Sequence, residues 1–290
     1  DYIFKTFKPD IVYHAAAYKH VNLVEKNIYS ALYNNFIGTI NLVASSIKFK
    51  TKNFVFVSTD KAVNPINVMG ASKRLCEIFI QSISKLNHIN LDFIDGDNKD
   101  LENLTLFTIV RFGNVLGSSG SVVPIFKDQI IKGGPVTLTD KKVTRYFMNI
   151  EEAAELVIQA GALTEKENSG QICYLDMGEP IEIYKLAEMM IKYSGYTIKD
   201  SSNPLGDIDI KIIGLKDGEK LHEELVSFES SIKTKNKKIY IIDEERVFWP
   251  TLKSEIKNIK YLENDVKIYE IFEKLIKNFN DESDKNQFLN

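Results

Sequence analysis

Four consecutive polar residues at 58–61 (Ser-Thr-Asp-Lys) follow directly after an apolar, β-branched stretch at 54–57. Such a stretch is typical of a buried parallel strand, and open α/β sheets bind ligands at the carboxyl ends of their strands. A carboxyl group beside an amine can supply a general acid and a general base. The run therefore favours proton-transfer chemistry, and the alternative explanation is a capped loop in which Asp60 and Lys61 are solvated.

The elements around this run predict how it is presented. A helix is expected at 69–84, and the four-residue spacing of Met69 and Lys73 places both on one of its faces. A Gly/Ser-rich loop at 112–121 follows the strand expected at 106–111, where backbone N–H groups can face phosphate oxygens. Two such loops after neighbouring strands are stronger evidence of function than a single Gly/Ser-rich loop.

The first strand, expected at 11–14, ends in three alanines at 15–17. Small residues there let a flat group such as a nucleotide approach the backbone, but tight helix–strand packing explains them equally well. A polar trio at 18–20 (Tyr-Lys-His) lies near the same edge. The helix expected at 30–46 contains several Asn residues and a Gly, which weaken a helix and so indicate close packing or a polar contact.

Composition indicates a globular protein with a substantial core in one large or two modest domains, because 44% of the 290 residues are hydrophobic and 27% are charged. The net charge of −3 and the scattered lysines give no support for a nucleic-acid partner. Cys76 and Cys173 are expected as core residues in a reducing compartment. No apolar run reaches the roughly 18 residues of a membrane span, no signal-peptide pattern is present, and no metal-binding spacing is recognised.

The expected fold class is α/β, with a Rossmann-like doubly wound parallel sheet. The chain starts at Asp1, reaches its first strand almost at once and contains no G-x-G-x-x-G, so we expect the opening βαβ units to be missing. Residues 1–116 are expected to form a partial dinucleotide-binding domain. Residues 117–290 are expected to form mainly a substrate-binding lobe, interleaved with elements of the sheet.

The later elements are predicted less closely. Residues 85–104 are polar and turn-rich and are expected to be a surface excursion. A capping box at Asn149 and Glu152 predicts the start of a helix. Further strands are expected at 136–138, 171–176, 210–214 and 239–242, and further helices at 183–191 and 266–279.

Several motifs together resemble one family. They are STDKAVNP at 58–65, MGASK at 69–73, VRFGNVLG at 110–117 and DGEKL at 217–221, with HAAAYKHV at 14–21 and TRYFM at 144–148. In this order they are similar to the nucleotide-sugar 4,6-dehydratases of the CapD/PglF-like group, extended short-chain dehydrogenases of polysaccharide and glycan biosynthesis. The resemblance covers residues 8–225.

The resemblance implies a UDP-N-acetylglucosamine 4,6-dehydratase that uses NAD, with NADP as an alternative. In that reaction C4 gives up a hydride, water is eliminated across C5 and C6, and the hydride returns to C6. The resemblance implies that Asp60 is the acid at the C6 hydroxyl and Lys61 the base at C5. A lysine base must be neutral, so we expect the pKa of Lys61 to be lowered to roughly 7–8. Thr59 is implied to bind the sugar around O4.

Met69 stands where most short-chain dehydrogenases have a tyrosine that takes the hydroxyl proton. The base at O4 is therefore open between Asp60, Thr59 and a water relay, and Lys73 keeps its implied place at the nicotinamide ribose. The implied cofactor contacts are Ala15, Ala16, Asn35, Ser58, Lys73 and Arg111. The implied substrate contacts are Lys19, Asn114, Ser121, Val122, Arg145 and Glu219, with Arg145 pairing a phosphate.

The resemblance further implies a homo-oligomer, a cytoplasmic location and a membrane-spanning region upstream that anchors the whole protein at the inner face of the membrane. Two other functions compete. A nucleotide-sugar 4-epimerase, or a dehydratase that also epimerises C5, is the nearer one, although simple epimerisation does not need Asp60 and Lys61. A non-catalytic nucleotide-binding module is the other, and Met69 is its best support.

Overall fold

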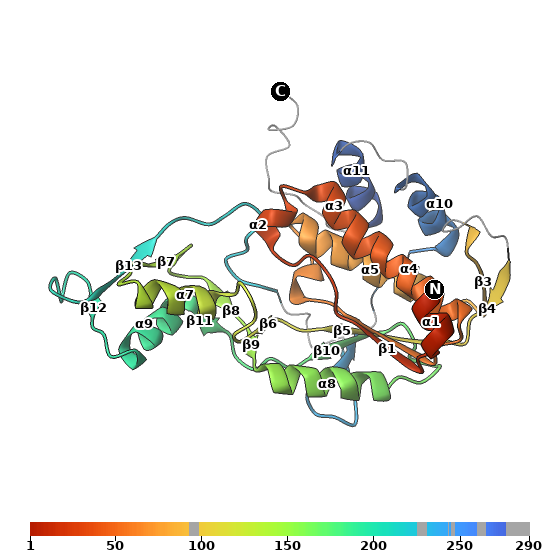
Figure 1. Cartoon of the computed structure of the whole chain (residues 1–290), viewed down its shortest axis with the longest axis horizontal. Helices are drawn as coiled ribbons and strands as arrows, with labels where there is room; N and C mark the ends of the chain where they lie inside the picture. Colours follow the sequence, from red (N-terminus) through yellow and green to blue (C-terminus); the bar gives the residue numbers. More distant parts are fainter. Residues whose placement is uncertain (93–98, 225–230, 243, 245–246, 260–264, 277–290) are drawn as a thin grey trace.

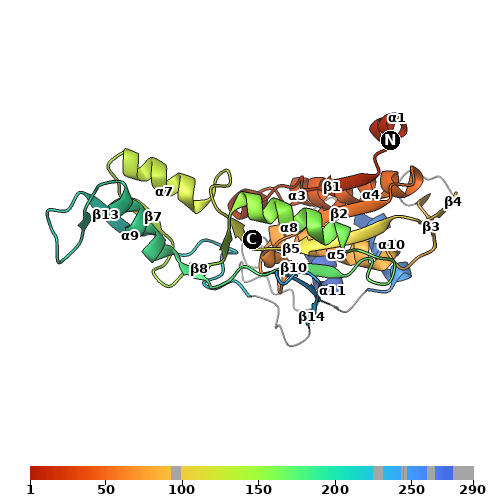
Figure 2. The same cartoon turned by 90° about the horizontal axis from the view of Figure 1, so that it is seen from below.

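The computed structural model describes residues 1–92, 99–224, 231–242, 244, 247–259 and 265–276. These residues form an elongated molecule with a larger lobe around one central sheet and a smaller lobe at one end (Figure 1; Figure 2). None of the helices in this part of the chain combines the length and apolarity needed to cross a bilayer. Both cysteines are buried and free, as predicted.

The main sheet has six strands. Their order is β1 (Ile11–His14), β2 (Asn53–Val57), β5 (Leu106–Arg111), β10 (Ile172–Leu175), β15 (Ile239–Ile242) and β14 (Ser231–Lys233). The first four strands are parallel, whereas β15 runs antiparallel to β10 and β14 antiparallel to β15. The α/β class is confirmed, but the sheet is mixed rather than wholly parallel. A short turn joins β14 to β15, and such a turn can join only antiparallel strands.

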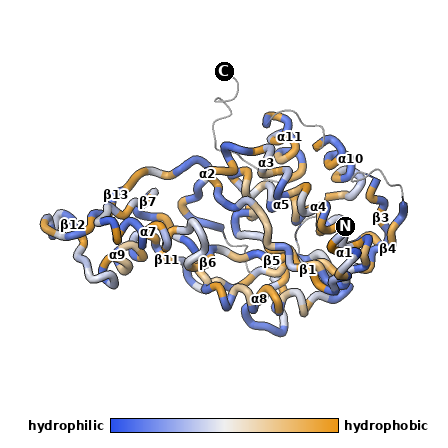
Figure 3. Tube along the Cα trace, viewed as in Figure 1, coloured by the Kyte–Doolittle hydropathy of each residue, from blue (hydrophilic) through white to orange (hydrophobic). Residues whose placement is uncertain are grey.

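Helices cover both faces of this sheet (Figure 1). Alternate residues of β2 point to opposite faces: Phe54 and Phe56 belong to one core cluster and Val55 to another. The first cluster packs under α3 (Ile28–Leu32), α4 (Gly38–Lys48), α5 (Val68–Ile83), α10 (Trp249–Ile259) and α11 (Asp265–Leu275). The second packs under α8 (Ile150–Ala162). Both hydrophobic and hydrophilic residues occur along α4 and α8 (Figure 3). In α8 the buried residues recur every three to four positions, as on one face of an amphipathic helix.

The helix predicted at 30–46 is divided. It consists of α3, a π-helical turn (Tyr33–Ile37) and α4. The buried Asn35 amide explains the interruption, because it accepts from Tyr18 N at 2.7 Å and donates to Tyr18 O at 3.0 Å and Ser72 Oγ at 3.0 Å. The expectation of close packing or a polar contact is confirmed, because the Asn35 side chain is buried and makes polar contacts.

Several elements were not predicted from the sequence. Among them are α1 (Tyr2–Phe7), α2 (Val21–Val24), α7 (Val122–Ile131) and α10, the short strands at the junction of the two lobes, β12 (Ile198–Lys199) of the smaller lobe, β14, and the antiparallel pair of β3 (His88–Asn90) and β4 (Asp100–Glu102) inside the expected surface excursion. Parts of three predictions lie outside the described residues. They are residues 93–98 of that excursion, Leu225 at the end of the region of family resemblance, and the last residues of the helix expected at 266–279.

The smaller lobe has its own core. It contains α7, β7 (Val136–Leu138), α9 (Ile183–Tyr193), β12 (Ile198–Lys199) and β13 (Ile208–Ile212). Short strand pairs lie at the junction of the lobes: β6 (Asn114–Val115) with β9 (Phe147–Met148), and β8 (Thr144–Arg145) with β11 (Ile181–Glu182). The chain returns to the larger lobe through α8 and β10, so the two lobes do not follow one another as separate segments of the sequence. The predicted domain boundary between residues 116 and 117 stays a prediction.

Candidate active site

The polar run after β2 forms one tight turn, a 3₁₀ helix (Asp60–Ala62). Backbone bonds tie it to the end of β5: Ser58 N donates to Val110 O at 2.7 Å, and Asp60 N donates to Phe112 O at 3.0 Å. The first turn of α5 packs directly on it, because a Cβ built on Gly70 would lie 2.2 Å from the Lys61 carbonyl oxygen. A glycine at this position thus permits the close approach that fixes the turn.

Asp60 and Lys61 form a close ion pair. Lys61 Nζ lies 3.0 Å from Asp60 Oδ1 and 3.3 Å from the Asn114 side-chain oxygen. The Thr59 hydroxyl donates to the same Asp60 oxygen at 2.9 Å. The other oxygen of Asp60, Oδ2, is buried and has no hydrogen-bond partner among the described residues. A buried carboxylate oxygen without a partner is uncommon in proteins and marks a functional candidate.

The expected lowering of the pKa of Lys61 is wrong for this structure. Burial lowers this pKa, but the nearby carboxylates of Asp60 and Glu223 raise it by more, so it lies above the ordinary lysine value. The positive charge of Arg145 opposes them only in part. In this state Lys61 is an ammonium ion rather than a free base.

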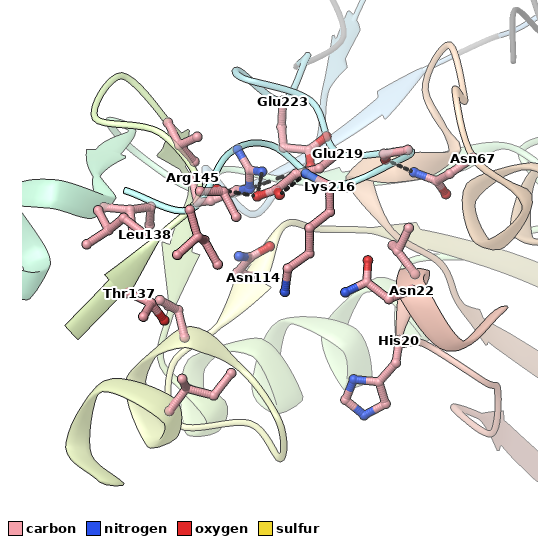
Figure 4. A pocket seen from close by; sticks show the side chains of 18 of the residues that line it. His20, Asn22, Asn67, Asn114, Thr137, Leu138, Arg145, Lys216, Glu219 and Glu223 are labelled. Atoms are coloured by element: carbon pink, nitrogen blue, oxygen red, sulfur yellow. Dashed lines mark hydrogen bonds and ion pairs between the residues drawn. The ribbon is translucent and has the colours of Figure 1, made fainter. Parts of the chain in front are cut away.

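A pocket of about 480 Å³ lies beside Lys61, at the junction of the lobes. Figure 4 shows Arg145, Glu219 and Glu223 on one side of it and His20 and Asn22 across from them. Its volume is in the range of small-molecule sites. Among the predicted substrate residues, it is lined by Asn114, Val122, Arg145 and Glu219.

The segment 216–224, called the strap here, closes one side of the pocket. The larger lobe holds it through Asn67 Nδ2, which donates to Gly218 O at 2.8 Å, and through Lys220 Nζ, which donates to Val63 O at 3.3 Å. The smaller lobe holds it through Arg145, which donates to the carbonyl oxygens of Lys220 at 2.8 Å and of Leu221 at 3.2 Å. The strap therefore joins the lobes across the site.

Arg145 is largely occupied by these contacts. Its guanidinium also donates to Thr144 O at 2.7 Å and lies 3.3 Å from Glu219 Oε1. The Glu219 carboxylate in turn accepts from the Thr139 hydroxyl at 2.9 Å. A phosphate would have to share or replace these partners, so the contact predicted for Arg145 stays a prediction.

Met69 and Lys73 lie one turn apart on α5, as their spacing predicted. Met69 is 4% exposed and packs in the core under the sheet. Lys73 Nζ donates to Val57 O at 2.8 Å and lies 4.5 Å from the centre of the Phe56 ring. Burial lowers the pKa of Lys73, although the neighbouring Cys76 and Glu77 partly offset this. The structure places this amine beneath the end of β2, next to the polar run.

The predicted cofactor residues fall into two groups. Ala15 and Ala16 are exposed at the carboxyl end of β1, where their single methyl groups leave the backbone approachable. The others hold the scaffold in this structure: Asn35 ties the loop after β1, and the Ser58 hydroxyl donates to Glu77 Oε1 at 2.6 Å. Arg111 is fully buried and pairs with Glu77 and Glu244.

Two predicted substrate residues lie apart from the pocket lining. Lys19 lines a neighbouring pocket of about 570 Å³ that α2 and α3 border, rather than the pocket beside Lys61. Ser121 precedes α7, and its buried hydroxyl has no hydrogen-bond partner among the described residues. Its neighbour Val122 does line the pocket.

Glu223 is the site residue that sequence reasoning missed. Its Oε1 atom lies 3.3 Å from Lys61 Nζ, and its side chain is 4% exposed. The nearest signal in the sequence was Glu219, which was predicted as a substrate contact and lines the same pocket as Glu223. Nothing in the sequence alone separates Glu223, which is buried, from its neighbour Glu224, which is exposed.

Fold and site together define the class of this chain. The extended short-chain dehydrogenases, which include nucleotide-sugar epimerases and dehydratases, have these features. Their parallel strands carry helices on both faces, and a polar pocket lies where the sheet meets a second lobe. Within this class, the chain belongs to the polysaccharide biosynthesis protein family, whose model matches residues 1–244.

Curated relatives agree with this membership. The chain is 48% identical over 225 residues both to the probable polysaccharide biosynthesis protein EpsC of Bacillus subtilis and to the capsular polysaccharide biosynthesis protein CapD of Staphylococcus aureus. These matches cover 78% of this chain and 33% of each relative, so the chain spans about a third of their length. A UDP-N-acetylglucosamine 4,6-dehydratase (inverting) of Campylobacter jejuni is 32% identical over 223 residues, 77% of this chain and 58% of that protein.

Solved structures share the fold. The X-ray structure of Pen from Bacillus thuringiensis matches 88% of this chain and 76% of its own, with a TM-score of 0.65 and 31% identity. The UDP-glucose 4-epimerase of Thermus thermophilus, solved in complex with NAD, matches 79% of this chain and 72% of its own, with a TM-score of 0.61 and 19% identity. The Rossmann-like fold class is thereby confirmed.

Proposed function

We propose that the full-length protein dehydrates UDP-N-acetylglucosamine to a UDP-4-keto-6-deoxy-N-acetylhexosamine in the biosynthesis of a polysaccharide or glycan. The observation that carries this proposal is the 3.0 Å contact between Asp60 Oδ1 and Lys61 Nζ, with Lys61 lining the pocket. An acid and a base this close to each other can act on two adjacent carbons of one sugar. The Campylobacter jejuni relative carries this activity in its name.

The elimination needs a base at C5 and an acid at the C6 hydroxyl. In the proposed reaction Lys61 removes the C5 proton, Asp60 protonates the departing hydroxyl, and Thr59 binds the sugar around O4. The resting pair has its proton on Lys61. Transfer of that proton to Asp60 across the 3.0 Å contact breaks one N–H bond, forms one O–H bond and leaves both groups in the state they require. The raised pKa of Lys61 adds to the free-energy cost of this transfer, which the reaction must supply before the lysine can act as the base.

The proposed cofactor is NAD, with NADP as the alternative, and when bound it would supply the acceptor and donor of the hydride that leaves C4 and returns to C6. The residues present fit the nicotinamide end of such a group. Ala15 and Ala16 leave the end of β1 open to a flat ring, and the buried Lys73 amine lies under the neighbouring strand end. Lys73 would hold the ribose, and Asn35 would keep the loop after β1 in place. A homo-oligomer and an upstream membrane anchor remain predictions for the whole protein.

The competing functions make fewer demands on the site. A 4-epimerase has no elimination to catalyse and so no use for an acid–base pair at this position. A binding module would gain nothing from a buried carboxylate oxygen without a partner, which is costly to maintain. The contact between Asp60 and Lys61 therefore favours the dehydratase.

The test is mass spectrometry of UDP-N-acetylglucosamine after incubation with the full-length protein, purified with its cofactor. We expect the sugar to lose one water. An unchanged mass with a new chromatographic isomer would instead identify an epimerase. No new species would mean another substrate or a binding module.

A further inference from the structure

Glu223 is a buried carboxylate to which the chemistry proposed above gives no part. Its Oε1 atom lies 3.3 Å from Lys61 Nζ and 3.7 Å from Arg145 Nε. Both partners are cations that line the pocket. Because an unpaired charge at a site that is 4% exposed is costly, the three side chains form one mutually dependent cluster.

The two residues next to Glu223 in the strap are each held in place by a contact of their own. On one side, His222 forms a β-bridge with Thr144, and its Nδ1 atom lies 2.9 Å from the Thr144 hydroxyl oxygen. On the other side, the Glu224 carboxylate accepts from Asn64 Nδ2 at 2.7 Å. The Glu223 carboxylate is therefore held toward Lys61 by its neighbours in the sequence as well as by its own ion pairs.

The charges that face Lys61 are unequal. Two carboxylates, Asp60 and Glu223, and one guanidinium, that of Arg145, act on its amine among the described residues. The Asn114 amide is the neutral neighbour, with its oxygen 3.3 Å from Nζ. The excess of negative charge stabilises the ammonium form. Without Glu223, one carboxylate and one guanidinium would remain.

We propose that Glu223 is a positioning residue that holds the Lys61 amine beside Asp60 at the pocket and keeps the proton of the resting pair on the lysine. The proposal rests on the function proposed above for its effect on turnover. Its effect on Lys61 can be measured without turnover. A role confined to fold stability would leave the protonation of Lys61 unchanged.

The first experiment measures that protonation directly. The full-length wild type and the Glu223→Gln and Glu224→Gln variants are labelled with trace acetic anhydride over a range of pH, and acetylation of Lys61 is read by peptide mass spectrometry. Only the neutral amine reacts, so the curve reports the pKa of Lys61. We expect Glu223→Gln to move the curve about one pH unit to lower pH. Glu224→Gln removes the same charge one residue away, on the exposed side, but keeps a side-chain oxygen that can accept from Asn64 Nδ2. It should therefore leave the position of Glu223 and the curve unchanged. An unmoved Glu223→Gln curve would overturn the proposal.

The second experiment uses turnover. Because Lys61 loses the carboxylate 3.3 Å away that holds its amine beside Asp60, Glu223→Gln should lower kcat about tenfold or more, and this loss of position should outweigh the easier release of the lysine proton. The affinity for UDP should stay within about twofold, and the alkaline fall of kcat/KM should move to lower pH. Glu223→Asp, which retains the charge, should restore much of the wild-type profile and also serves if Glu223→Gln folds poorly. A lower kcat with an unmoved pH profile would reduce Glu223 to a structural residue. If the wild type forms no dehydrated product while the labelling curve still moves, the proposed function fails and the role of Glu223 stands.

Discussion

Lys61 illustrates how a single side chain is governed by residues far away in the sequence. An isolated buried lysine has a lowered pKa, and that expectation alone would make it a ready base. Here the carboxylates of Asp60 and Glu223 outweigh burial. The ion-paired form and the neutral form of Asp60 and Lys61 contain the same number of protons. The pair can therefore reach the neutral form by moving one proton from Lys61 to Asp60, without exchange with solvent.

We expect Lys61→Ala to abolish dehydration while leaving UDP-sugar binding nearly intact. The loss in kcat should be about 1,000-fold, since the variant lacks the group that removes the C5 proton. Calorimetric titration with UDP measures binding, and Lys166→Ala, at an exposed lysine of the larger lobe, serves as the control. Parallel loss of binding and turnover would make Lys61 a binding residue.

Met69→Tyr is expected to retain part of the activity. A thioether cannot accept the hydroxyl proton in any useful way, so the reaction does not depend on Met69 as a base. Because Met69 is 4% exposed, the larger side chain should cost about 1–3 kcal/mol of stability. Turnover is therefore measured well below the melting temperature of the variant. Complete inactivation of a folded variant would show that the pocket depends on the shape of Met69.

At the scale of elements, the first turn of α5 positions the acid–base pair. Asn67 caps this helix by accepting from Gly70 N at 2.8 Å, and it also donates to the strap. The same helix start thus supports the polar run through the close packing at Gly70 and supports the strap through Asn67. The start of α5 therefore fixes both the turn that carries Lys61 and the strap that carries Glu223.

Gly70→Ala tests this arrangement. The added Cβ would lie 2.2 Å from the Lys61 carbonyl oxygen, so the helix or the turn must shift, at a cost of about 1–3 kcal/mol. We expect lower stability together with a disproportionate loss of kcat. Gly38→Ala is the matched control, because its Cβ would meet only the Tyr33 carbonyl oxygen, at 3.9 Å, and should stabilise the protein by about 0.5 kcal/mol. Chemical denaturation measures the stability of the two variants, and turnover measures their kcat. Equal effects of the two substitutions would contradict the prediction.

At the scale of the whole molecule, the sheet packs ionisable groups in its core. His14 is 5% exposed at the end of β1, with its Nε2 atom 2.8 Å from the Thr39 hydroxyl oxygen. Burial, with a smaller contribution from the charge of Lys73, lowers the pKa of His14 from 6.5 to about 4. The folded protein therefore keeps this imidazole neutral at a pH where the unfolded chain binds a proton.

This difference predicts a dependence of stability on pH. Between pH 6.5 and about 4 the unfolded chain binds more protons at His14, so the free energy of unfolding should fall by about 3 kcal/mol as the pH drops through that window. Urea denaturation at several pH values measures the fall. It should be much shallower in His14→Gln and unchanged in His88→Gln, at an exposed histidine. An equally steep fall in His14→Gln would assign the effect to other groups.

Local patterns in the sequence were sufficient for the α/β class, the position of most strands of the main sheet and of several helices, and the adjacent acid and base at Asp60 and Lys61. Strand alternation, helix caps and strand-end loops depend on neighbours in the chain, so they can be recognised there. The tertiary structure decided the antiparallel edge of the sheet, the interruption of the first long helix at Asn35, and the proximity of Glu223 to Lys61. These depend on contacts between segments distant in sequence, and the direction of the Lys61 pKa follows from such a contact. Burial and long-range charge pairing exist only once the chain is folded.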